Sequence, residues 1–168
     1  MLLLHRPALR GKAVVVSGSE ESRHGIVLAK SELAKRCGIQ TGESMIEARA
    51  KCPDLICIPP NYRLYLRISE MVRGIYSDYS DQCEPFGLDE SWIDVTASAG
   101  LFGSGETIAN EIRDRIKREI GITASIGVSY NKIFAKLGSD MRKPDATTLI
   151  CCYVNAFRYM GGYPEEIL

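Results

Sequence analysis

The stretch EPFGLDESWIDVT (residues 84–96) places two acidic residues, Asp89 and Glu90, side by side among apolar neighbours. Apolar residues on both sides of the pair are typical of two short strands that are partly buried in a core. Uncompensated charge is costly in such surroundings, so the two carboxylates need either water or a cation. Gly87 and the small Ser91 flank the pair and allow a turn. The stretch therefore predicts a β-hairpin with the acids at its tip.

The acidic pair suggests a metal site only under one geometric condition. On a continuous strand Asp89 and Glu90 would point to opposite faces, so they share a site only if the chain turns between them. Two converging carboxylates repel each other unless a divalent cation lies between them. Oxygen ligands without His or Cys suit Mg²⁺ and the chemistry of nucleotidyl transfer. The alternative is a solvated acidic turn, and spacing alone favours that alternative.

Composition limits the classes of protein to consider. The chain has 168 residues, of which 45% are hydrophobic and 25% charged, as in an ordinary globular protein. Its 21 basic and 21 acidic residues balance, so any site for a polyanion must come from local clustering. No apolar run approaches a bilayer span, and we expect no membrane partner. The six cysteines show no zinc-like spacing, which predicts reduced, mostly buried thiols in a cytoplasmic protein.

Upstream of the hairpin, residues 1–61 predict a small α/β unit. The segments KAVVVSG (residues 12–18) and DLICIPP (residues 54–60) are β-branched runs with turn residues at their ends, which predicts strands. The segment GIVLAKSELAKRCG (residues 25–38) predicts a helix stopped by its final glycine. The segment TGESMIEARAKCP (residues 41–53) predicts a second helix stopped by its final proline.

Around the hairpin, residues 62–148 predict the order α-β-β-α-β. An amphipathic helix is expected over residues 62–80, and a helix with an isoleucine at every fourth position is expected over residues 106–121. A half-buried strand is expected over residues 122–128, followed by a helix with Ser129 as its N-cap. This order is one strand short of the β-α-β-β-α-β ferredoxin-like arrangement. The predicted fold class is therefore α/β (α+β), with a ferredoxin-like unit whose first strand is missing.

Two segments together carry a resemblance to a known family. EPFGLDESWIDVT, followed by TASIGVSYNKIFAKLGSDMRKPD (residues 123–145), closely resembles the Y-family translesion DNA polymerases of the bacterial DNA polymerase IV type. The motif SxNKxFAKxxSDMxKP is long and specific, and GIVLAKSELAKRCGIQTG is similar to the family's fingers segment. The resemblance runs from about His5 to Thr148 and outweighs the solvated-turn alternative.

The resemblance implies a DNA-directed DNA polymerase that acts in translesion synthesis and DNA repair. Its partners would be primer–template DNA and deoxynucleoside triphosphates, and its cofactor Mg²⁺. Asp89 and Glu90 match the family's acidic motif, which implies that they are catalytic and bind the metal. Lys143 matches a lysine that contacts the triphosphate, and Lys35 matches a basic fingers residue that reaches the same phosphates.

A further pair of lysines points to DNA. Lys132 and Lys136 fall four residues apart on one face of the predicted helix, which suits a basic strip along a DNA backbone. The alternative for this pair is an ordinary solvated helix face.

The resemblance also implies a domain organisation and several departures from it. Residues 1–61 correspond to fingers, residues 62–148 to palm, and residues 149–168 form a tail in which the resemblance stops. The first palm strand, with its metal-binding aspartate and steric gate, the thumb and the little finger have no counterpart. Glu32 stands where many members carry a tyrosine.

These departures predict a truncated palm-plus-fingers fragment that is inactive alone, and a sliding clamp is expected as a partner only if a further C-terminal tail exists. One alternative is a catalytically dead remnant that binds nucleotide or nucleic acid weakly. Another is a ferredoxin-like regulatory or small-ligand domain, in which neither Lys143 nor a metal at Asp89 has a role.

Overall fold

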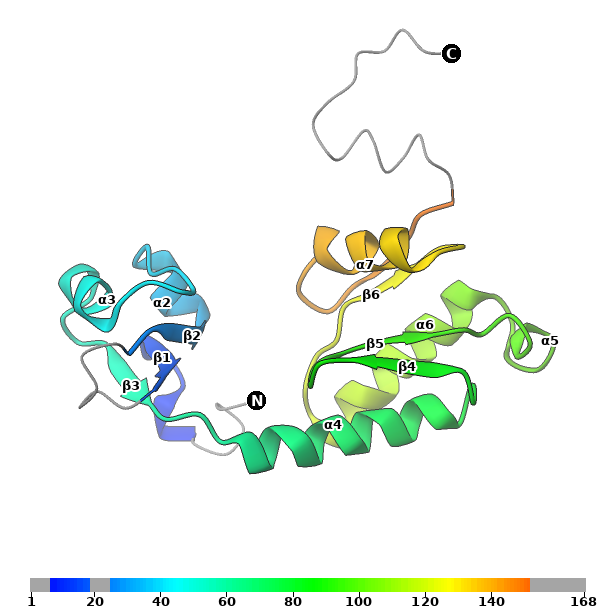
Figure 1. The fold of residues 1–168 in the computed structure, drawn as a ribbon, viewed down its shortest axis with the longest axis horizontal. Coiled ribbons are helices and arrows are strands. Elements are labelled where there is room, and N and C mark those ends of the chain that lie inside the picture. Colours follow the sequence, from blue (N-terminus) through cyan, green and yellow to red (C-terminus); the bar gives the residue numbers. More distant parts are fainter. Residues whose placement is uncertain (1–6, 19–24, 152–168) are drawn as a thin grey trace, which may run out of the picture. The chain divides into compact units, whose positions relative to one another are not determined.

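The computed structural model describes residues 7–18 and 25–151 (Figure 1). The chain divides into two compact units, Met1–Arg63 and Leu64–Leu168. Each unit has its own core of buried apolar side chains. Within the described residues, no helix has both the length and the apolar character that a membrane crossing requires.

The first unit is built on a three-stranded sheet in the order β2-β1-β3. Strand β1 (Val14–Ser17) pairs antiparallel with β2 (Val27–Lys30) and parallel with β3 (Ile56–Ile58). The central strand β1 is buried along its whole length, which explains its run of three valines. Helices α2 (Glu32–Arg36) and α3 (Met45–Lys51) and a 3₁₀ turn, η1 (Pro7–Leu9), complete the unit.

The helix predicted over residues 25–38 is only partly correct. Its first half forms β2, and α2 begins only after Ser31, whose hydroxyl accepts a hydrogen bond from the backbone N–H of Ala34. Val27 is fully buried and pairs with β1. Pairing with a buried central strand therefore overrides the helical pattern, as β-branched residues readily permit. The strands predicted at residues 12–18 and 54–60 are confirmed.

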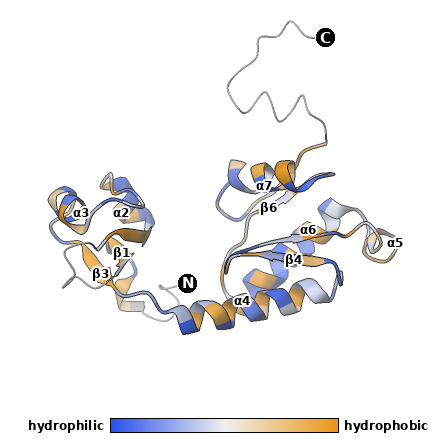
Figure 2. Ribbon diagram, in the orientation of Figure 1, coloured by the Kyte–Doolittle hydropathy of each residue, from blue (hydrophilic) through white to orange (hydrophobic). Residues whose placement is uncertain are grey.

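The second unit contains the predicted order of elements. It runs from α4 (Tyr62–Ser77) through β4 (Cys83–Phe86), β5 (Glu90–Ile93) and α6 (Gly105–Arg115) to β6 (Ile126–Val128). Helix α6 continues as a π-helical turn, η2 (Ile116–Ile120), and ends at Gly121, as predicted. The isoleucine repeat is buried at Ile108, Ile112 and Ile116, which form the core together with α4. Figure 2 shows the resulting apolar stripes on the helices of this unit.

Three details of the second unit differ from the predictions. Residues Ala99–Phe102 form a short helix, α5, that the sequence patterns do not predict. Helix α7 (Lys132–Met141) is capped by Asn131 and not by Ser129, whose hydroxyl instead donates to the backbone carbonyl of Ile150. An additional strand, β7 (Thr147–Leu149), pairs parallel with β6. The fold therefore continues through Ile150, which is 3% exposed, past the predicted palm boundary at residue 148.

The strands of the second unit form two separate sheets. Among the described residues, β5 pairs only with β4, and β6 pairs only with β7. Both sheets contribute side chains to the same core, through Ile93 at the end of β5 and Ile126 in β6. The α+β character of the fold is thus confirmed, and the two sheets are held together by a shared core.

Candidate active site

The acidic pair lies at a hairpin turn, as the sequence predicts. In the β4–β5 ladder Phe86 is paired with Glu90, which leaves Gly87, Leu88 and Asp89 as a three-residue turn. Gly87 has a φ of 73°, a conformation that favours glycine and permits the tight reversal. Asp89 is exposed in the turn, whereas Glu90 begins β5 and is half-buried.

The two faces of the hairpin carry different chemistry. The paired positions Phe86–Glu90 and Glu84–Trp92 alternate along the strands and therefore share one face. The rings of Phe86 and Trp92 lie 5.0 Å apart on this face. The opposite face carries Ile93, which packs against the core. The hairpin therefore presents two acids and two aromatic rings on the side away from its core contacts.

Helix α7 places its lysines against this polar face. Lys132 forms an ion pair with Glu84, and its ammonium lies 5.5 Å from the centre of the Trp92 ring. The indole N–H of Trp92 also donates to the backbone carbonyl of Lys132, at 3.1 Å. One turn later, Lys136 Nζ lies 2.6 Å from Glu90 Oε1. The predicted DNA-contacting lysines are thus both paired with acids of the hairpin.

The lysine series continues to the predicted nucleotide contact. Asp140 follows Lys136 by one turn, and its Oδ2 lies 3.2 Å from Lys136 Nζ. Its other oxygen, Oδ1, lies 2.6 Å from Lys143 Nζ. Glu90 and Lys143, predicted from different motifs, are therefore linked through two intervening side chains.

The position of α7 is fixed by close contact between backbones. A Cβ added at Gly127 in β6 would lie 1.8 Å from the carbonyl oxygen of Ala135 in α7, a distance that no structure tolerates. Gly138 of α7 belongs to the same close contact, since its own added Cβ would lie 3.2 Å from the Gly127 Cα. Only glycine at residue 127 allows this crossing. This packing consequently fixes the position of α7 on β6.

The ion pairs shift the pKa values of Lys136 and Asp140. The carboxylate of Glu90, and after it that of Asp140, raise the pKa of the Lys136 ammonium, against an opposing effect of burial. The ammonium of Lys143, and after it that of Lys136, lower the pKa of Asp140. Both shifts favour the charged forms, so the side chains stay ionised at neutral pH.

The carboxylates at the turn have the donor chemistry of a hard divalent cation. A cationic group already lies against Glu90 in the form of the Lys136 ammonium. Asp89 Oδ1 turns back over its own loop and would lie 4.0 Å from a Cβ at Gly87. Within the part of the chain that the structure describes, no group of three or more His, Cys, Asp or Glu residues could hold a metal ion. Two carboxylates still suit Mg²⁺, which binds proteins through one or two carboxylates together with substrate phosphates.

One predicted site residue, Lys35, belongs to the first unit. It is exposed there, in the last turn of α2. Conversely, Asp140 and Glu84 belong to the site but were not predicted. The spacing of Lys136, Asp140 and Lys143 on one helix is a signal that could have identified Asp140. No local signal identifies Glu84, because its partner lies 48 positions away.

Residues 1–140 match the model of the impB/mucB/samB family. The chain belongs to this family. The DNA polymerase IV of Acetivibrio thermocellus is 58% identical over 166 residues, which make up 98% of this chain and 41% of that protein. The DNA polymerase IV of Moorella thermoacetica is 44% identical over 145 residues, or 86% of this chain and 36% of that protein. The alignment with the Acetivibrio protein continues past Thr148, where we expected the resemblance to stop.

Solved structures agree with this family membership. A Y-family DNA polymerase chimera, Dbh-Dpo4(243-245)-Dbh, superimposes with a TM-score of 0.83 at 28% identity, over 89% of this chain and 44% of that chain. An insertion ternary complex of Dbh DNA polymerase gives a TM-score of 0.81 at 29% identity, with the same coverage of both chains. The predicted resemblance to Y-family DNA polymerases is confirmed. The chain spans about two fifths of the length of the curated relatives described above.

Proposed function

We propose that this chain contributes the metal-binding carboxylates and a triphosphate contact to Mg²⁺-dependent nucleotidyl transfer by a Y-family DNA polymerase. Asp89 and Glu90 would hold the metal. Lys143 and Lys35 would contact the triphosphate of an incoming deoxynucleotide, and Lys132 and Lys136 would follow the backbone of primer–template DNA. Family membership and the likeness to a Dbh ternary complex support this assignment.

The observation that carries the proposal is the linkage of Glu90 to Lys143. Glu90 of β5, a carboxylate suited to a divalent cation, is joined to Lys143, a lysine suited to phosphate that follows α7, through two side chains of α7. Nucleotidyl transfer requires the metal site and the phosphate-binding lysine to lie close together. The metal and the lysine ammonium contact oxygens of the same phosphates. An ordinary solvated helix has no such arrangement with a hairpin turn.

The roles of the side chains follow from their chemistry. When bound, Mg²⁺ would stabilise the negative charge on the attacking and leaving oxygens. Asp89 and Glu90 would provide oxygen ligands, and Lys143 would donate hydrogen bonds to phosphate oxygens from its exposed position after α7. Lys132 and Lys136 can reach DNA only by leaving Glu84 and Glu90, so we expect their contribution to DNA binding to be small.

Primer extension tests the proposal directly. The full chain is incubated with primer–template DNA, deoxynucleoside triphosphates and Mg²⁺. Extension that is lost in Asp89→Asn and kept in Asp81→Asn would support the assignment; Asp81→Asn is the control, since it removes an exposed acid before β4. Extension that survives in Asp89→Asn would contradict the assignment of the carboxylates.

A second candidate is a non-catalytic remnant that binds nucleotide. The ion pair between Glu90 and Lys136, which engages one of the two carboxylates, favours this candidate. It predicts no extension at any protein concentration, together with triphosphate binding that weakens in Lys143→Met. Extension by the unmodified chain would exclude it.

A further inference from the structure

Four charged side chains of the second unit form a continuous series, which we call the charge chain: Glu90, Lys136, Asp140 and Lys143. The contacts along it are 2.6 Å from Glu90 to Lys136, 3.2 Å from Lys136 to Asp140 and 2.6 Å from Asp140 to Lys143. Signs alternate at each step. Each inner member is therefore shared between two partners of opposite charge.

Sharing makes the contacts dependent on one another. Lys136 divides its attraction between Glu90 and Asp140, and the shorter contact is the one to Glu90. If Glu90 becomes unavailable, the whole attraction of Lys136 falls on Asp140, whose Oδ1 already holds Lys143. Two ammonium groups then compete for one carboxylate and repel each other. The ion pair between Asp140 and Lys143 is weakened as a result.

The side chains of the charge chain are exposed enough to exchange partners. The exposed fractions of the side chains are 35% for Glu90, 36% for Lys136, 47% for Asp140 and 56% for Lys143. Pairs with this exposure are weak, so a bound cation or phosphate can displace them. The helix itself need not move, since the glycine contact between Gly127 and α7 fixes its position.

We propose that the charge chain couples cation binding at Glu90 to phosphate binding at Lys143. Displacement of Lys136 from Glu90 by a divalent cation moves Lys136 onto Asp140 and releases Lys143 for the phosphates of a nucleotide. Lys136 and Asp140 are then positioning residues, which act through their two neighbours. This inference rests on the proposed function of Glu90 and Lys143.

The test uses Glu90→Gln to break the first contact without any metal. Inorganic triphosphate is titrated into the full chain in metal-free buffer and followed by calorimetry. Loss of the Glu90 charge should tighten triphosphate binding by about threefold, the range expected from a partly exposed ion pair. Glu84→Gln is the matched control, since it removes a hairpin acid paired with Lys132, outside the charge chain. We expect a clearly smaller gain in this control.

The route through Lys143 is tested by a double variant. In Glu90→Gln combined with Lys143→Met, the gain should disappear. Equal gains in Glu90→Gln and Glu84→Gln would show a general electrostatic effect and overturn the proposal. A gain that persists without Lys143 would overturn it as well.

A metal arm gives an independent readout. Lys136→Met removes the ammonium that competes for Glu90, so Mn²⁺ should bind about threefold more tightly, as measured by electron paramagnetic resonance. Unchanged Mn²⁺ affinity in this variant would overturn the coupling. Thermal melts establish that each variant is folded.

The outcomes separate this inference from the proposed function. If Lys143→Met leaves triphosphate binding unchanged, the proposed role of Lys143 is wrong and the coupling falls with it. If Lys143→Met weakens binding but Glu90→Gln gains no more than its control, only the coupling is wrong.

Discussion

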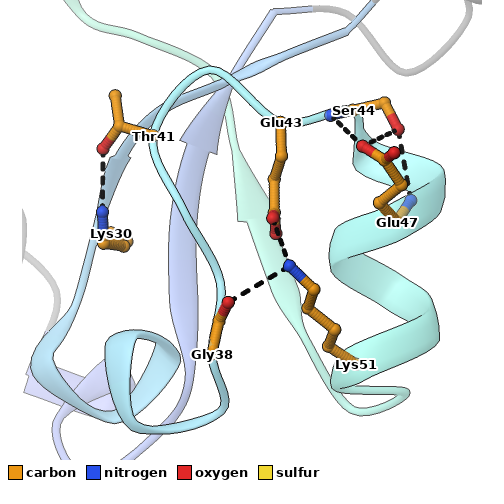
Figure 3. Close-up of polar contacts among 7 residues, drawn as sticks. All are labelled: Lys30, Gly38, Thr41, Glu43, Ser44, Glu47 and Lys51. Carbon is orange, nitrogen blue, oxygen red and sulfur yellow. Dashed lines mark hydrogen bonds and ion pairs between the residues drawn. The ribbon is translucent and has the colours of Figure 1, made fainter.

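The two units of the molecule use their ion pairs in different ways. In the first unit Lys51 contacts both Glu43 and the backbone of Gly38 (Figure 3). Its Nζ lies 2.5 Å from Glu43 Oε2 and 3.1 Å from the backbone oxygen of Gly38. The Glu43 side chain is only 10% exposed. In the second unit the charge chain is between 35% and 56% exposed, and its inner members are shared.

This difference separates structural from exchangeable charge. When a lysine that is paired with a buried carboxylate leaves, the charged carboxylate stays behind unpaired in a medium of low polarity, which is costly. A lysine that shares an exposed carboxylate can leave at little cost. The first arrangement stabilises a fold, and the second suits a site where ligands replace the partners.

The second unit should depend on packing more than on its ion pairs. Gly127→Ala places a methyl group against the carbonyl oxygen of Ala135 and forces α7 away from β6. We expect a loss of about 3 kcal/mol in the free energy of unfolding of this unit, measured by denaturation followed through Trp92 fluorescence. The control Gly74→Ala adds a methyl group in open space within α4 and should stabilise slightly. Equal stability of the two variants would contradict the packing account.

The stability of the first unit should depend on the ion pair between Lys51 and Glu43. Lys51→Met leaves a buried carboxylate with one fewer partner, and its Oε1 already has no hydrogen-bond partner among the described residues. We expect a loss of about 2 kcal/mol, because Lys51 itself is partly exposed. Hydrogen exchange of the Val15 and Val27 amides reports the stability of this unit. Lys12→Met is the control, and a similar loss in it would argue against a specific role for Lys51.

The start of α3 offers a smaller effect with a pH signature. Ser44 and Glu47 form a capping box, visible in Figure 3, and Ser44→Ala should cost about 1 kcal/mol. Hydrogen bonds from the Ser44 side chain and then its backbone N–H lower the pKa of Glu47. A lowered pKa stabilises the fold above the ordinary glutamate value, and this contribution is lost as pH falls through the lowered value.

The pH dependence distinguishes the cap from general helix propensity. The stability difference between the unmodified chain and Ser44→Ala should shrink as the pH falls below about 4.5. Hydrogen exchange within α3 at several pH values measures this difference. A difference that stays constant down to acid pH would show that the Glu47 carboxylate takes no part.

The smallest effect is expected in the charge chain. Lys136→Met should change the free energy of unfolding of the second unit by less than about 1 kcal/mol, because its partners are exposed. Denaturation monitored by Trp92 fluorescence checks this value. A loss as large as that of Lys51→Met would remove the distinction between the two units.

The sequence predicts those features that local patterns determine. The isoleucine repeat of α6 and the hairpin turn before Glu90 follow from side-chain periodicity and from Gly87. Strand β2 was missed because its conformation depends on pairing with β1, which comes from elsewhere in the chain. Strand β7 was missed for the same reason, since three residues carry too little pattern without their partner β6.

The candidate site shows the same division. Asp89, Glu90 and Lys143 were predicted through family motifs, whose spacing is local. The pairing of Lys136 with Glu90 joins residues 46 positions apart, so the sequence indicated a basic helix face but not its acidic partners. Contacts between distant residues are set by the packing of β6 and α7, which periodicity does not reveal.

The metal-binding role of the acidic turn is tested most directly by the stoichiometry of Mn²⁺ binding. Electron paramagnetic resonance on the full chain measures free Mn²⁺ during a titration, with Asp81→Asn as the control. We predict one tightly bound ion that is lost in both Asp89→Asn and Glu90→Gln and retained in Asp81→Asn. Unchanged binding in Asp89→Asn would show that the two carboxylates do not share a cation and would contradict this account.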